Sequence, residues 1–127
     1  MKKKKPLSKP FEKKKTIYLP VFMNYKIVIV YTSDKVKSYK KAIKGSNIDP
    51  EDTDFSAIHI YRKGHYSYLI FPKESTDPGT VAHECWHLIR HVFEHSGAKM
   101  DHELVGYHLG YLVNTVYSFL TSQKGNI

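Results

Sequence analysis

The chain contains two histidines and a glutamate in the pattern H-E-x-x-H, at His83, Glu84 and His87. In a helix, residues four positions apart lie on one face about 6 Å apart along the axis, so both imidazoles can reach a single metal ion. Glu84 lies about 100° round the helix from His83, which places its carboxylate beside a water on that ion and not on the ion itself. The pattern predicts a Zn²⁺ site with His83 and His87 as ligands.

A five-residue pattern also occurs by chance, so its surroundings matter. The apolar residues of this segment fill one arc of the helix, from about 140° to about 300° relative to His83; they are Val81, Ala82, Cys85, Trp86, Leu88, Ile89, Val92 and Phe93. Both histidines of the motif lie outside that arc, so the helix has one face for the core and another for chemistry. Cys85, the only cysteine, lies in the apolar arc and is predicted to pack in the core. A single cysteine excludes an intramolecular disulfide.

A catalytic zinc ion usually has three protein ligands and a water, so the pair needs a third partner. Glu103 is the candidate, in the first turn of a predicted last helix that Asp101 caps. It lies at the edge of that helix's apolar face, near Gly106 and Gly110, where two helix backbones can approach closely. We predict Glu103 as the third ligand, with Asp101 and His102 as alternatives.

The first half of the chain has the composition of strands. We expect a short edge segment at 16–19, before Pro20, and a buried strand over 24–32. Residues 55–62 and 65–72 predict a β-hairpin joined through Lys63 and Gly64. His59 and His65 are interpreted as strand or turn residues and not as ligands.

Three helices are predicted. The first covers 33–45 and begins at Ser33 or Asp34, the motif helix runs from Thr76 or Asp77 to Gly97, and the last reaches about Thr121. The fold class we expect is α+β, with a small twisted, mainly antiparallel sheet of about three or four strands, a covering helix and two helices that enclose the metal.

Basic charge is concentrated at the start of the chain. The net charge is +8, and residues 1–15 hold eight lysines and one glutamate, which gives +7 and leaves about +1 for the other 112 residues. We predict a disordered lysine-rich tail at 1–15 and a single metal-binding domain at 16–127. Such a tail either is merely solvated or contacts nucleic acid or another acidic partner.

Nothing in the composition indicates a membrane protein. No stretch approaches the length of apolar sequence that a membrane span needs, and the positive start lacks the apolar segment of a secretory signal. We therefore expect a cytoplasmic location, in a host cytoplasm or a virion if the chain is phage-encoded.

The motif with a downstream glutamate resembles the zincin metallopeptidases, in the gluzincin arrangement. More narrowly, the segment from AHECWH to ELVGYHLGYL looks like small phage and prophage proteins of unassigned function. The resemblance covers about the last 45 residues. It implies a zinc ion held by His83, His87 and Glu103, with Glu84 as general base.

If the resemblance extends to activity, the chain is a small metallopeptidase in which metal-activated water attacks a peptide carbonyl. An additional donor to the oxyanion is then expected, and Tyr107, one turn after Glu103, is the candidate ahead of His102, His108 and Tyr111. Strand 65–72 resembles the zincin strand that pairs with extended substrates. The alternative is a non-catalytic virion or accessory protein in which zinc staples two helices and the tail contacts nucleic acid.

Overall fold

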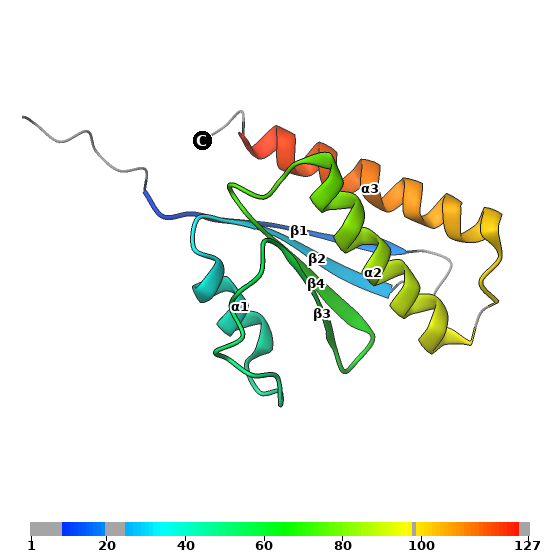
Figure 1. The fold of residues 1–127 in the computed structure, drawn as a ribbon, viewed down its shortest axis with the longest axis horizontal. Helices are drawn as coiled ribbons and strands as arrows, with labels where there is room; N and C mark the ends of the chain where they lie inside the picture. Colours follow the sequence, from blue (N-terminus) through cyan, green and yellow to red (C-terminus); the bar gives the residue numbers. More distant parts are fainter. Residues whose placement is uncertain (1–8, 20–24, 98, 125–127) are drawn as a thin grey trace, which may run out of the picture.

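The computed structural model describes residues 9–19, 25–97 and 99–124, which form a four-stranded sheet with helices on both faces (Figure 1). The strands are β1 (Glu12–Leu19), β2 (Tyr25–Thr32), β3 (Ile58–Arg62) and β4 (Tyr66–Pro72), in the order β1-β2-β4-β3. The β1/β2 and β3/β4 pairs are antiparallel, while β2 and β4 are parallel. The predicted fold class is confirmed, and the parallel pair makes the sheet mixed.

The two central strands have core residues on both faces, which is why their sequences are almost continuously apolar. In β2, Ile27 and Ile29 pack into the cluster that includes the motif helix, while Val28 and Val30 face the opposite cluster. The predicted hairpin is confirmed, with β3 and β4 joined across Gly64, whose φ of 99° favours glycine.

Helix α1 (Lys35–Ile43) covers one face of the sheet, and α2 (Pro78–Ser96) and α3 (His102–Lys124) cover the other. Asp77 caps α2 by accepting the backbone N–H of Thr80, and Gly97 ends it at a φ of 77°. All three helices were predicted from the sequence. None of the described helices is long and apolar enough to cross a membrane.

Strand β1 corrects the predicted boundary of the tail. Residues 12–15, expected to be disordered with the rest of 1–15, form the first half of this edge strand, whereas residues 1–8 lie outside the described part. Glu12 joins β1 to α1, because its carboxylate accepts hydrogen bonds from Lys41 Nζ (2.7 Å) and from the Ser38 hydroxyl. Partial burial alone raises the pKa of Glu12, but these two bonds and the charges of Lys14 and Lys41 outweigh it and bring the pKa to about 2.

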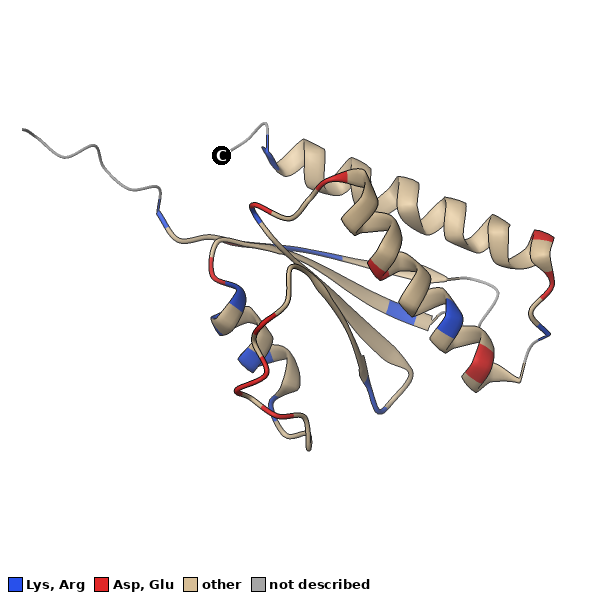
Figure 2. Cartoon of the chain, viewed as in Figure 1, with Lys and Arg blue, Asp and Glu red and all other residues tan. Residues whose placement is uncertain are grey.

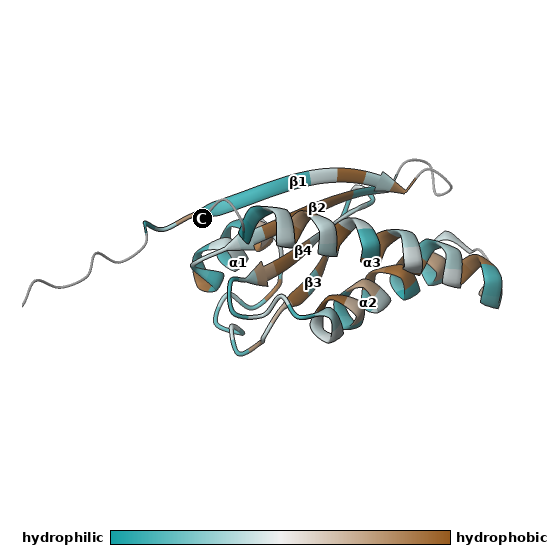
Figure 3. Cartoon of the chain, turned by 90° about the horizontal axis from the view of Figure 1, so that it is seen from above, coloured by the Kyte–Doolittle hydropathy of each residue, from teal (hydrophilic) through white to brown (hydrophobic). Residues whose placement is uncertain are grey.

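Helices α2 and α3 are antiparallel and divide their face of the sheet between them. Helix α2 contacts β3 and β4, and α3 contacts β1 and β2 (Figure 3). The rings of Phe93 and His108 meet at a centroid distance of 5.8 Å, which fixes the level at which the second half of α2 packs against the first half of α3. Cys85 lies fully buried in the same core cluster, as predicted.

Candidate metal centre beside strand β3

The two motif histidines lie exposed on the first half of α2 with their rings turned toward each other. Their Nε2 atoms are 3.0 Å apart. Zinc binds histidine nitrogen at about 2.0–2.1 Å, so two nitrogens on a tetrahedral ion are about 3.3 Å apart. His83 and His87 therefore fit one metal ion in donor type and nearly in spacing.

Glu84 points away from solvent and toward the sheet. Only 8% of the residue is exposed, and its Oε2 lies 4.0 Å from His83 Nε2. Burial raises the pKa of the Glu84 carboxyl, against the lowering effects of His83 and of a hydrogen bond from the backbone N–H of His59. A raised pKa makes a carboxylate a stronger base, which suits it to accept a proton from water.

A groove runs between α2 and β3. One pocket of about 520 Å³ is lined by Ala57, Ile58, His59, Glu84, His87, Arg90, His91 and Glu94. A second, of about 510 Å³, is lined by Ser56, Ala57, Asp77, Gly79, Thr80, His83 and Glu84. Ala57 and Glu84 line both pockets, so the carboxylate lies where the two halves of the groove meet, with one motif histidine in each half.

His59 is the functional candidate that the sequence did not identify. It lines the groove opposite His87, and its Nε2 lies 2.8 Å from Ser67 Oγ, which in turn lies 2.6 Å from the hydroxyl of Tyr25. Burial, with smaller contributions from His91 and His87, lowers the pKa of His59 to about 3, so the imidazole is neutral at physiological pH.

The hydrogen-bond chain also fixes the tautomer of His59. The hydroxyl of buried Tyr25 is satisfied if it donates to Ser67, and Ser67 then donates its own hydrogen to Nε2 of His59. The reverse direction leaves the Tyr25 hydroxyl hydrogen with no acceptor that the described residues provide. We therefore assign the ring proton of His59 to Nδ1, which gives this groove-lining residue an N–H donor.

Further along the groove, His91 extends the row of histidines on α2. Its ring stacks on His95 (centroids 3.9 Å apart) and lies 4.1 Å from the ring of Tyr61. The Nε2 atom of His91 is buried and has no hydrogen-bond partner in the described part of the chain. His59 and Tyr61 lie on one face of β3, as the alternation of side chains along a strand predicts. Alternation does not predict that this face packs against α2.

The structure does not bring the predicted third ligand to the histidine pair. Glu103 lies five residues before His108, and His83 lies ten before Phe93, so antiparallel packing separates Glu103 from His83 by about 20 Å along the helix axes. The alternatives, Asp101 and His102, lie at the same distant end, where Asp101 caps α3. Within the described residues, no three His, Cys, Asp or Glu side chains form a group suited to a metal ion.

The structure also places Tyr107 away from the groove and corrects the predicted substrate strand. Tyr107, the predicted oxyanion donor, is 82% exposed near the start of α3, on the far side of α2 from the groove. Strand β4, predicted to pair with substrate, is interior and hydrogen-bonded to β2 and β3 on its two sides. The edge strand beside the motif is β3.

Comparisons with models of protein families, with curated proteins and with solved structures found no match.

Proposed function

We propose that the chain is a zinc-dependent hydrolase that cleaves peptide bonds at the groove between α2 and β3. The observation that carries the proposal is the position of Glu84, a buried carboxylate beside two convergent histidines, where the two halves of the groove meet. A metal that only stapled the fold would need ligands from two elements, whereas His83 and His87 both come from α2.

The chemistry divides between the ion and the side chains. Bound zinc, held by His83 and His87, supplies Lewis acidity for a carbonyl and for water. Glu84 accepts the proton of the attacking water and delivers it to the departing amine. Its contact with the backbone N–H of His59 holds the carboxylate at the edge of β3, so the base and the strand are kept in a fixed relation.

The free edge of β3 favours an extended peptide as substrate. Within the described part of the chain, β3 pairs with β4 on one side only. At its other edge the backbone N–H of His59 contacts Glu84, and the remaining outward backbone groups lie next to the groove. An extended segment that adds to a sheet edge gains main-chain hydrogen bonds and presents alternate side chains to pockets. In this arrangement His59, and not Tyr107, supplies an N–H donor to the carbonyl oxygen that becomes negative during the reaction.

Hydrolysis of a mixed peptide library tests the proposal. Zinc-loaded protein should generate new amino termini that are detected by mass spectrometry, and the chelator 1,10-phenanthroline should stop their appearance. Restoring zinc should restore cleavage. A library that stays intact with protein shown to contain zinc would contradict the assignment as a peptidase.

His59→Phe should reduce kcat/KM on any cleaved peptide by about 10²-fold, because one oriented donor to the developing oxyanion is lost. His59→Gln, which keeps an N–H group, should retain more of the rate. Imidazole ¹⁵N shifts give an independent measurement: His59 should show the Nδ1–H tautomer in wild type and lose that preference in Ser67→Ala. An unchanged rate in His59→Phe with unchanged zinc content would exclude this role.

A further inference from the structure

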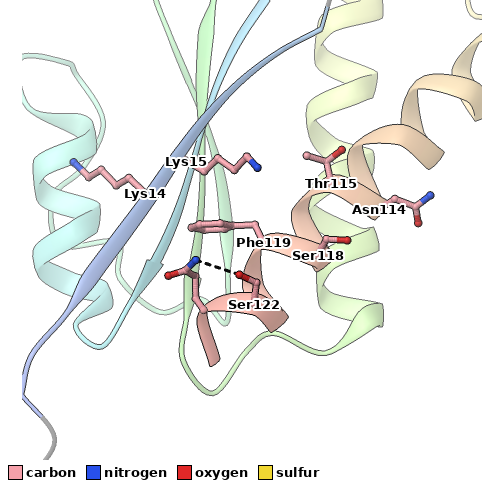
Figure 4. Close-up of a pocket in the computed structure, with 8 residues that line it drawn as sticks. Lys14, Lys15, Asn114, Thr115, Ser118, Phe119 and Ser122 are labelled. Atoms are coloured by element: carbon pink, nitrogen blue, oxygen red, sulfur yellow. Dashed lines mark hydrogen bonds between the residues drawn. The ribbon is translucent and has the colours of Figure 1, made fainter. Parts of the chain in front are cut away.

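A second surface lies at the edge of the sheet opposite to the candidate metal centre, where α3 runs beside the edge strand β1. A pocket of about 640 Å³ is lined there by Lys14, Lys15, Asn114, Thr115, Ser118, Phe119, Ser122 and Gln123 (Figure 4). The lining is cationic on the strand side and rich in hydroxyl and amide groups on the helix side. Neither the proposed hydrolysis nor the packing of the core explains this composition.

The alternation of β1 determines which lysines lie on the α3 side of the strand. Ile17 and Leu19 pack into the cluster under α2 and α3, and Lys13 and Lys15 have the same parity along the strand. Figure 4 shows the Lys15 side chain extending toward α3, while Lys14 points the other way, toward Glu12 and α1. Among the described residues, Lys13 and Lys15 have no ion-pair partner.

The exposed face of α3 continues from the pocket as one stripe. Asn114, Ser118 and Ser122 follow each other at four-residue spacing, and Tyr107 and Tyr111 extend the same face toward the start of the helix. Tyr107 is 82% exposed and Tyr111 46%. The stripe from Tyr107 to Ser122 is about 22 Å long.

No acidic side chain interrupts this stripe. Between Leu104 and Gln123 the sequence has no charged residue, and α3 is coloured as charged only near its two ends (Figure 2). The ligand that fits must therefore present negative charge to the β1 lysines, accept hydrogen bonds from hydroxyl and amide groups, and offer flat apolar faces to tyrosine rings. A single-stranded polynucleotide has all three properties, because its phosphates are spaced along a chain of stackable bases.

We infer that the stripe of α3 and the lysines of β1 bind single-stranded nucleic acid, with phosphates at Lys13 and Lys15 and bases stacked on Tyr107 and Tyr111. Duplex DNA fits less well, since its bases are stacked on each other and unavailable to the tyrosines. An acidic protein surface would satisfy the lysines but gives no particular reason for the exposed aromatic pair.

Fluorescence anisotropy with labelled oligo-dT and oligo-rU of about 20 nucleotides tests the inference on the full chain. Binding should weaken steeply between about 50 and about 200 mM salt, as counterion release requires. Lys13→Gln with Lys15→Gln should weaken binding about 10-fold and flatten the salt dependence. Tyr107→Ala with Tyr111→Ala should weaken binding about 10-fold or more while leaving the salt dependence unchanged.

Matched controls separate this surface from general basicity. Lys37→Gln with Lys40→Gln removes the same charge from α1, on the opposite face of the sheet, and Tyr18→Ala removes an exposed tyrosine of β1 that has the parity of Glu12. Both controls should bind within about twofold of wild type. Equal losses in test and control variants would overturn the inference and show that binding depends on overall basic charge and not on this surface. Equal affinity for duplex, or no anisotropy change, would overturn it too, and the latter would favour a protein partner.

Discussion

Glu84→Gln is expected to remove hydrolysis, by about 10² to 10⁴-fold in kcat, while leaving zinc content unchanged. Glutamine has nearly the same shape and can keep the contact with the backbone N–H of His59 only through its amide oxygen, but it cannot accept a proton from water. Steady-state rates on a peptide identified from the library, with zinc measured by elemental analysis, check the prediction. Wild-type turnover in this variant would exclude Glu84 as the base.

The same variant should be more stable than wild type near neutral pH. The pKa of Glu84 is raised above its ordinary value of 4.5 by burial, so the ionised carboxylate opposes folding. Compared with Glu84→Gln, the wild-type protein is therefore most stable below the ordinary pKa of 4.5. It loses stability relative to the variant as pH rises through the pKa of Glu84 in the folded state. In urea unfolding, the free energy of unfolding of Glu84→Gln should exceed that of wild type at about pH 7. The difference should become smaller toward about pH 4. Side chains that serve only the fold are not expected to behave in this way.

How much of this site follows from sequence depends on the range of each interaction. The caps at Asp77 and Gly97, the separation of the histidine pair from the apolar arc and the burial of Cys85 are all local to α2, and helical periodicity predicts them. The direction in which α3 returns is not local. It depends on contacts between distant residues, such as Phe93 with His108. Helical periodicity alone therefore gave no basis for predicting that Glu103 lies near the metal.

The position of His59 in the groove was not predicted, for a related reason. A lone histidine in a strand is usually a surface residue, and nothing within its own segment indicates otherwise. Its importance comes from Ser67 on β4 and Tyr25 on β2, which are brought together by the insertion of β4 between β2 and β3. The parallel pairing of β2 and β4 thus leaves β3, and not β4, at the edge of the sheet beside α2, and it brings together the hydrogen-bond chain behind His59.

Zinc binding is expected to depend on His87 and to be indifferent to Glu103. His87→Ala removes one of two convergent nitrogens, and loss of a direct ligand should exceed the 10 to 100-fold that loss of a supporting residue typically costs, so affinity should fall by about 100-fold or more. Glu103→Gln changes a residue about 20 Å away along the helix axes and should bind zinc as wild type does. Competition with a chromophoric zinc indicator measures both affinities.

The comparison discriminates between two ligand sets that share the same motif. If both variants lose zinc equally, Glu103 is a ligand, and the antiparallel register that Phe93 and His108 define cannot hold in the zinc-bound protein. If only His87→Ala loses it, the ion has two protein ligands, and its remaining positions are left to water and to substrate. A two-ligand site also predicts weaker binding than a three-ligand one. Weak binding to the isolated chain would therefore support the geometry of the groove, whereas binding tight enough to resist chelation would point to a third ligand.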